Sequence, residues 1–81
     1  MHWVKEVKYL WEYLLEITFN DGKTKIVDMN PYVGGNGVFN PLRDIEYFKK
    51  VKLDDVGNTI CWDSGADICP DRLYATGKEK S

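Results

Sequence analysis

An alternating segment that ends in an Asp-Gly pair constrains the fold of this chain more than any other feature. Between residues 11 and 19, aromatic or apolar side chains occupy every second position, and mostly polar side chains stand between them. A period of two is typical of a β-strand with one buried face. Asp21-Gly22 follows, and this pair favours the positive φ angles of a tight turn. The pattern therefore predicts an antiparallel hairpin whose return strand covers residues 24–29.

Two registers of this hairpin are open. A two-residue Asp21-Gly22 loop would place Ile17 opposite Ile26, whereas a bulged three-residue loop would place Ile17 opposite Lys25. Residues directly opposite each other in an antiparallel pair lie on the same face of the sheet. Because the pairing of Ile17 with Ile26 keeps the buried face apolar, we favour the two-residue loop.

Shorter sequence patterns predict the remaining strands and helices. The imperfect alternation of residues 4–10 predicts an edge strand, which forms a three-stranded meander with the hairpin. Asn30 and Asp44 suit the N-caps of short helices, and Pro70 suits the first position of another. Further strands and helical turns are expected at residues 30–33, 45–50, 51–54, 59–62 and 69–74. The predicted fold class is α+β, with a small antiparallel β-meander sheet and short helices packed on one side.

The chain is short enough for one domain. Its 81 residues predict a single domain over residues 1–81, with an ordered core over about residues 3–74 and a frayed tail at residues 75–81. Three Trp, five Tyr and three Phe are many for this length, and each buries a large area. We therefore expect Trp3, Trp11 and Trp62 to lie in or near the core.

Charge and hydropathy argue against several classes of partner. The formal net charge is −2, and the sequence lacks the clustered basic residues of a nucleic-acid-binding face. No uncharged apolar run approaches the roughly 20 residues of a membrane span, and charge follows the start too closely for a signal peptide. We expect no direct binding of nucleic acid, no membrane association and a cytoplasmic location. There, Cys61 and Cys69 would stay reduced and pack as small buried side chains.

No set of catalytic or cofactor-binding residues assembles in the sequence. His2 is the only histidine and is expected to be solvated, which argues against His-dependent catalytic triads. Gly34-Gly35-Asn36-Gly37 lacks the Lys-Ser or Lys-Thr of a phosphate-binding loop, so it predicts a chain reversal instead. We expect no enzymatic activity and no cofactor.

Three acidic residues raise the alternative of an acid–base or metal site. Asp63, Asp67 and Asp71 are spaced by four, but Gly65 and Pro70 interrupt the helix that would align them. The segment also differs from the calcium loop of an EF-hand. We expect Asp67 to accept backbone N–H bonds that hold a turn. An enzyme or metal site around Asp63 and Asp67 remains the alternative.

Several segments together resemble a known family. They are Phe19-Asn20-Asp21-Gly22, Val27-Asp28, Phe39-x-x-Leu42, Phe48 and the closing Trp62-x-x-Gly65-Ala66-Asp67-Ile68-Cys69-Pro70-Asp71-x-Leu73-Tyr74. Their order and spacing resemble the family called domain of unknown function 2442 over nearly the whole chain. The closing segment is the specific part. Asp63 departs from the pattern, because the turn of the family is expected to carry proline there.

This resemblance implies a small bacterial α+β domain whose biochemical role is not established. Some relatives resemble fusions to a helix-turn-helix DNA-binding domain, and others lie in arrangements similar to toxin–antitoxin pairs. The resemblance brings no catalytic residue. The signature residues are expected to be structural: Trp62, Gly65, Asp67, Cys69, Pro70, Leu73 and Tyr74.

The sequence therefore leaves three candidate functions. The favoured one is a non-enzymatic interaction module that binds a protein partner or a second copy of itself. The second is an accessory domain of a DNA-linked transcriptional regulator, which would act through a separate DNA-binding partner. The third is the enzyme or metal site around Asp63 and Asp67.

Overall fold

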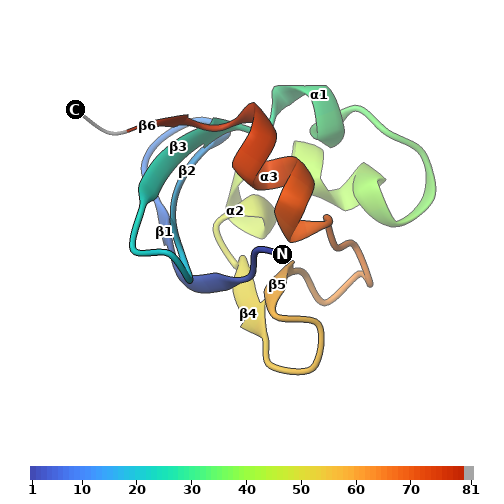
Figure 1. Cartoon of the computed structure of the whole chain (residues 1–81). Helices are drawn as coiled ribbons and strands as arrows, with labels where there is room; N and C mark the ends of the chain where they lie inside the picture. The colour runs from blue at the N-terminus through green and yellow to red at the C-terminus, as the bar shows by residue number, and fades with distance from the viewer. Residues whose placement is uncertain (80–81) are drawn as a thin grey trace.

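A curved antiparallel sheet forms one layer of the molecule. The computed structural model describes residues 1–79 of the chain. The sheet has the strand order β1-β2-β3-β6, and Figure 1 shows it curling against a layer of short helices. Its strands are β1 (Val4–Tyr9), β2 (Leu14–Phe19), β3 (Thr24–Asp28) and β6 (Lys78–Glu79). The first three form the expected meander.

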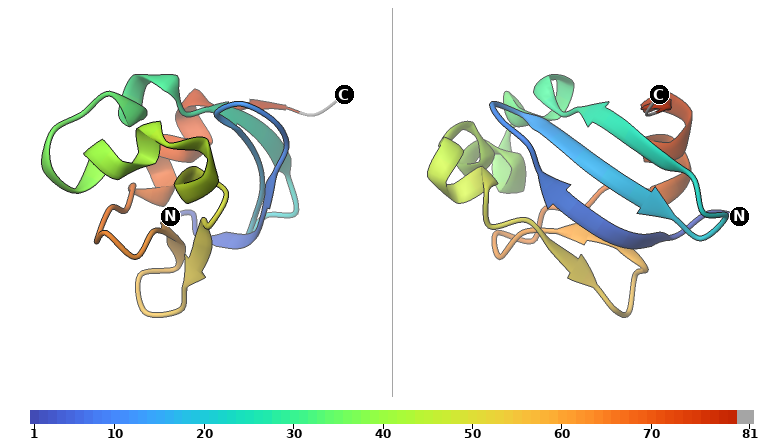
Figure 2. Two further views of the ribbon diagram at one scale, coloured as in Figure 1. Left: turned by 180° about the vertical axis from the view of Figure 1, so that it is seen from behind. Right: turned by 90° about the vertical axis from the view of Figure 1, so that its left-hand side faces the viewer.

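A second, two-stranded sheet extends this layer. It pairs β4 (Lys52–Asp54) with β5 (Thr59–Cys61) in antiparallel fashion. This hairpin lies beside β1, as Figure 2 shows. A hydrogen bond of 2.9 Å from the Val4 amide to the Asn58 carbonyl joins the two sheets.

Short helices cover the inner face of the larger sheet. They are α1 (Asn30–Val33), the 3-10 helix η1 (Gly37–Arg43), α2 (Ile45–Phe48) and α3 (Pro70–Thr76). Asp44 caps α2 by accepting a hydrogen bond from the Glu46 amide at 3.0 Å, as its residue type favours. Asn30, in contrast, is the first residue of α1, and Met29 occupies the cap position. The predicted α+β class is confirmed.

The core lies between the inner face of the sheet and these helices. Alternate residues of β2, Leu15, Ile17 and Phe19, are fully buried, as the period of two predicted. Phe48 and Trp62 pack against each other from the helical side, with ring centroids 5.7 Å apart. Aromatic rings thus supply much of the volume of a small core.

The favoured register of the β2–β3 hairpin is wrong. Ile17 lies opposite Lys25, and Ile26 lies opposite Glu16 on the outer face. The loop has three residues, because the Phe19 amide donates to the Lys23 carbonyl at 2.9 Å and Gly22 has a φ angle of +88°. A lysine is tolerated on the inner face because its amine reaches a carbonyl oxygen of α3, which satisfies a polar group that burial would otherwise penalise.

Two of the three tryptophans are on the surface, contrary to expectation. Trp3 is 44% exposed and Trp11 is 59% exposed, whereas Trp62 is 2% exposed. Trp11 precedes β2 in a tight turn that the Leu14 amide closes on the Trp11 carbonyl. Glu12, inside this turn, has a positive φ angle of 50°. The alternating pattern begins at residue 11, but the strand begins only at Leu14. The pattern is therefore longer than the strand.

Regular secondary structure extends to Glu79 in the described part of the chain. Helix α3 continues to Thr76, and Lys78 then pairs with Ile26 of β3. The frayed tail expected at residues 75–81 stays a prediction, and residues 80–81 lie outside the described part. Within residues 1–79, no helix has the length and apolar character that a membrane crossing requires.

Candidate interaction surface

The closing segment anchors the chain through its apolar residues. Trp62 donates its indole N–H to the Phe48 carbonyl at 3.0 Å, and Leu73 is fully buried. Between them, Gly65 has a φ angle of +95°, which L-residues rarely adopt. Pro70 begins α3 at a position where its missing N–H costs nothing. These residues therefore fix the backbone between β5 and α3.

Asp67 does not take the role expected of it. Its side chain is exposed and accepts no hydrogen bond from residues 1–79, although its backbone bridges to Cys61. Ser64 holds the turn instead: its hydroxyl donates to the Val38 carbonyl at 2.7 Å and accepts from the Ala66 amide at 3.4 Å.

The two cysteines are free thiols that differ in exposure. Cys69 is exposed just before α3, and Cys61 is half-buried in β5, so the expectation that both are buried is wrong for Cys69. Burial raises the pKa of the Cys61 thiol. A raised pKa leaves less of the thiolate, which is the reactive form of cysteine.

The acidic residues of the closing segment do not converge. Asp63 forms an ion pair with Lys52, whose hydrogen bond lowers the pKa of that carboxyl. Asp71 accepts hydrogen bonds from His2 instead. Within residues 1–79, no three His, Cys, Asp or Glu side chains gather where they could hold a metal ion.

Tyr74 is the centre of a polar and aromatic cluster that joins four parts of the chain. Its hydroxyl donates to the Asp21 carboxylate at 2.7 Å, and its ring meets Phe19 edge-on at 5.0 Å. His2 stacks on the ring with centroids 3.6 Å apart, while the Lys25 amine lies 3.8 Å from the ring centroid. Two groups this close would overlap on one face, so His2 and Lys25 lie on opposite faces of the ring.

Hydrogen bonds within this cluster shift several pKa values. The bond from Tyr74 lowers the pKa of Asp21, and the same bond raises the pKa of Tyr74. Nearby, the ion pair of Lys23 with Glu79 raises the lysine pKa and lowers the glutamate pKa. Each shift favours the protonation state that makes the contact, so the cluster is built to persist at neutral pH.

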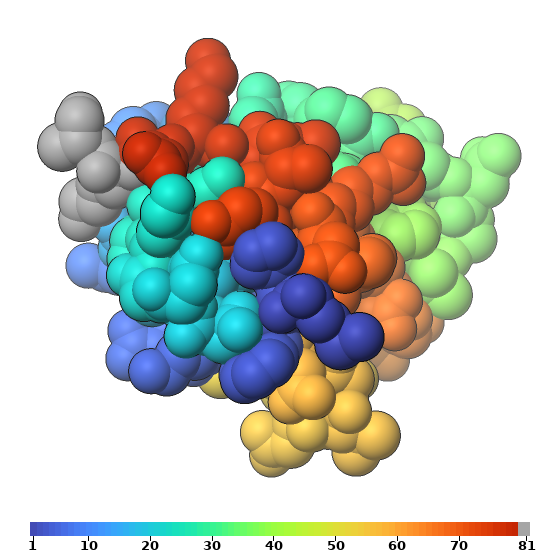
Figure 3. All heavy atoms as spheres, viewed as in Figure 1, coloured from blue at the N-terminus to red at the C-terminus, as the bar shows by residue number. Residues whose placement is uncertain are grey.

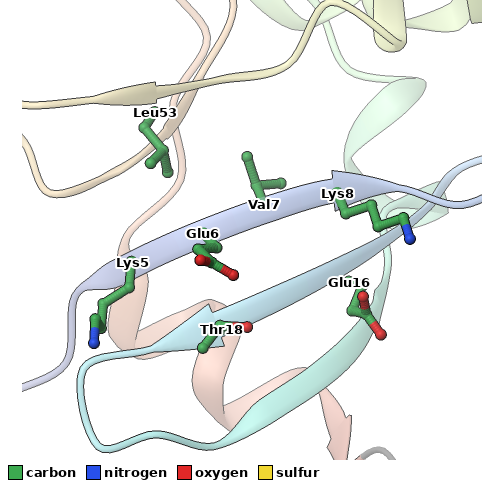
Figure 4. A pocket seen from close by; sticks show the side chains of 7 residues that line it. All are labelled: Lys5, Glu6, Val7, Lys8, Glu16, Thr18 and Leu53. Carbon is green, nitrogen blue, oxygen red and sulfur yellow. The ribbon is translucent and has the colours of Figure 1, made fainter.

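Within residues 1–79, the outer face of the larger sheet is not covered by the helices, which pack on the inner face (Figures 1 and 2). A shallow hollow of about 430 Å³ lies over β1 and β2 and is rimmed by Leu53 of β4. Figure 4 shows the side chains that line it. A second hollow of about 330 Å³ lies over Leu14 and Ile26, beside β6.

This outer face combines apolar side chains with charges of both signs. Leu14, Ile26 and Leu53 provide the apolar part. The charged side chains that line the two hollows are Lys5, Glu6, Lys8, Glu16, Asp28, Lys78 and Glu79. Groups of opposite sign also lie side by side, since Lys8 lies opposite Glu16. The face therefore lacks the single-sign field that polyanions require.

Comparison with known proteins places this arrangement in a family. The family described as protein of unknown function (DUF2442) matches residues 4–79. The chain belongs to the DUF2442 family. No curated protein matches it.

A solved structure resembles this DUF2442 chain closely in fold. It is the crystal structure of a candidate DNA-binding protein from Nitrosomonas europaea, with a TM-score of 0.80 and 23% sequence identity. The match covers 94% of the DUF2442 chain and 48% of the Nitrosomonas chain, so this chain spans about half the length of that protein. At this identity the likeness supports the fold alone.

Three contacts of this DUF2442 domain had no local signal in the sequence. His2, which was expected to be solvated, is half-buried, because Asp71 and Tyr74 hold it and the contact with Asp71 spans 69 residues of chain. Lys25 reaches Tyr74 in the same way. Ser64 lies within the segment that resembles the family, but its bond to Val38 spans 26 residues. Each partner is close only because the chain has folded.

Proposed function

We propose that this DUF2442 chain is a non-enzymatic protein-interaction domain that binds a protein partner on the outer face of its larger sheet. The observation that carries the proposal is the uncovered face itself, with Leu14, Ile26 and Leu53 in shallow hollows. Protein interfaces combine apolar groups with polar ones, and this face carries both kinds.

The charges of the face favour a protein over other occupants. Lysines and acidic residues are interspersed across it, so a partner of complementary mixed charge gains ion pairs in a fixed register. Nucleic acid would meet Glu6, Glu16 and Asp28 as repulsive groups. We therefore place a protein, encoded beside this chain as in toxin–antitoxin-like pairs, on this face. The proposal locates the domain in the cytoplasm, where free Cys61 and Cys69 stay reduced.

Co-expression with the product of the neighbouring gene tests this proposal. The wild-type chain should retain that product in a pull-down, and Ile26→Glu or Leu53→Glu should lose it because a charge enters the apolar part of the face. Val38→Glu is the matched control, since Val38 is similarly exposed (44%, against 39% for Leu53) but lies on the helical side. Unchanged circular dichroism would show that each variant folds.

Two results would refute the proposal. One is that the neighbouring product does not bind the wild-type chain. The other is that Val38→Glu loses binding while Ile26→Glu and Leu53→Glu keep it. Binding of the chain only to itself, seen as a dimer by light scattering, would replace the protein partner by a second copy.

A second candidate function is an accessory domain of a DNA-linked regulator. The observation that favours it is the shared fold with one half of the Nitrosomonas protein, a candidate DNA-binding protein. In this function DNA is bound by a separate polypeptide or segment, because this chain has a net charge of −2. A mobility-shift assay should show no complex with the purified chain alone and a complex when the partner is added. A shift with the chain alone would contradict this division of roles.

A further inference from the structure

The first three residues lie across the cluster around Tyr74. In Figure 3 the start of the chain (dark blue) fits between the β2–β3 hairpin (cyan) and α3 (orange). His2 carries most of this contact. Its backbone N–H and its ring Nδ1 both lie 2.9 Å from one carboxylate oxygen of Asp71, and its ring stacks on Tyr74 at an angle of 15°.

The neighbouring Trp3 adds a second attachment, to the hairpin. The Trp3 amide donates to the Asn20 side chain at 2.9 Å, and the Asn20 amide donates to the Trp3 carbonyl at 3.0 Å. Trp3 is 44% exposed, and Met1 is almost wholly exposed. The first core residue is Val4. Residues 1–3 are thus held by surface hydrogen bonds, one ring stack and the covered part of Trp3, and none of the three belongs to the core.

Segments held in this way open at a lower free energy than the core does. Opening would break the contacts of His2 and Trp3 while Val4 and the rest of β1 remain paired. The Tyr74 ring would not follow, because Asp21 holds its hydroxyl and Lys25 holds its other face. The ring would therefore be left as a fixed aromatic surface with one bare face beside the Asp71 carboxylate.

We propose that residues 1–3 form a releasable strap, closed by the His2–Asp71 contact, that covers one face of the Tyr74 ring. The strap is a conformational device that is separate from the outer sheet face, so its failure would leave the proposed function intact. Its role is to control when the Tyr74 face is accessible.

Amide hydrogen exchange measured by NMR tests the strap directly. The Asn20 amide reports closure because it donates to Trp3, and the Met29 amide reports the core because it donates to the Tyr13 carbonyl at 2.8 Å. In His2→Ala and in Asp71→Ala, exchange of the Asn20 amide should accelerate by about two- to tenfold, the effect of losing one net hydrogen bond. Exchange of the Met29 amide should not change.

Arg72→Ala is the matched control, because Arg72 is the exposed neighbour of Asp71 on α3. It should leave exchange at Asn20 unchanged. The Tyr74 ring protons should shift in His2→Ala, which removes the stacked imidazole, and stay in place in Arg72→Ala.

Two results would overturn the strap. If the Asn20 amide exchanges at the same rate in wild type, His2→Ala and Asp71→Ala, the His2–Asp71 contact does not close the strap. If Asn20 and Met29 accelerate together, residues 1–3 open only when the whole domain unfolds, and the strap is not releasable.

Discussion

The amine of Lys25 donates to the backbone carbonyl of Tyr74 at 2.8 Å and lies 3.8 Å from the centre of the same residue's ring. Lys25 extends from the inner face of β3, and Tyr74 lies in the C-terminal half of α3. A cation at that end of a helix meets its exposed carbonyl groups and the negative end of its dipole. This one side chain therefore fastens the last helix to the sheet.

Removing the amine of Lys25 should destabilise the domain. Lys25→Met keeps an unbranched side chain but loses both the charged hydrogen bond and the cation–π contact, so we expect a loss of about 1–2 kcal/mol in the free energy of unfolding. Urea denaturation followed by circular dichroism measures it. Lys50→Met, on an exposed lysine, should change stability by less than about 0.5 kcal/mol. Equal effects of the two substitutions would mean that the Lys25 contact contributes nothing specific.

The same residue explains why the hairpin could be predicted but its register could not. The alternation of residues 11–19 and the Asp-Gly pair are local signals, and they indicated two strands and a turn, although β2 begins at Leu14 and not at residue 11. The register depended on whether Lys25 could lie inward, and its partner Tyr74 is 49 residues away. Matching apolar residues therefore favoured the wrong pairing.

In the candidate site, too, features with a local signal could be predicted and features that depend on distant partners could not. The apolar anchors Trp62 and Leu73 could be expected in the core from their type, and the structure buries them. His2 could not be placed, because nothing near it in the sequence indicates Asp71 as its partner. An open sheet face follows from the predicted packing of the helices on one side, but its residues could not be assigned, because the favoured register would have placed Ile26 on the inner face.

Truncation of Trp62 should be among the most damaging single changes. The side chain is almost fully buried against Phe48, and its indole N–H is satisfied by the Phe48 carbonyl. Trp62→Ala should lower the free energy of unfolding by about 3–5 kcal/mol, the range for large aromatic residues in cores. Trp62→Phe should lose less, because it fills part of the volume and gives up only the hydrogen bond and one ring. A loss below about 1 kcal/mol in the alanine variant would contradict the burial of this side chain.

The Asp21–Tyr74 hydrogen bond should be visible in an alkaline titration. The bond raises the pKa of Tyr74 above its ordinary value near 10. A group whose pKa is raised on folding contributes stability below its unfolded pKa and loses that contribution as the pH rises through its folded pKa. Absorbance at 295 nm should therefore show one tyrosine that ionises late, and Asp21→Asn should move that titration to lower pH. An unchanged titration in Asp21→Asn would show that Asp21 does not set the Tyr74 pKa.

The Asp21 carboxylate should lose its stabilising effect in acid. Its pKa is lowered, chiefly by the hydrogen bond from Tyr74 and then by the one from the Lys23 amide, so its contribution is present above its ordinary value near 4 and is lost as the pH falls through the folded value. Wild type and Asp21→Asn should differ in melting temperature at pH 7, and the difference should shrink below about pH 4. A difference in melting temperature that stays constant across this pH range would mean that the charge of the Asp21 carboxylate does not stabilise the domain.

Gly65 and Gly34 differ in backbone strain. Gly65 has a φ angle of +95° between Trp62 and α3, and a Cβ there would meet only the Val38 side chain at 3.6 Å. Gly34 has an ordinary φ angle of −96°, and a Cβ there would point into open space. Gly65→Ala should therefore cost about 1–2 kcal/mol through backbone conformation, whereas Gly34→Ala should be neutral or slightly stabilising because alanine restricts the unfolded chain. Chemical denaturation of the two variants measures both effects, and equal stability of the two would show that the turn at Gly65 relaxes to a conformation open to all residues.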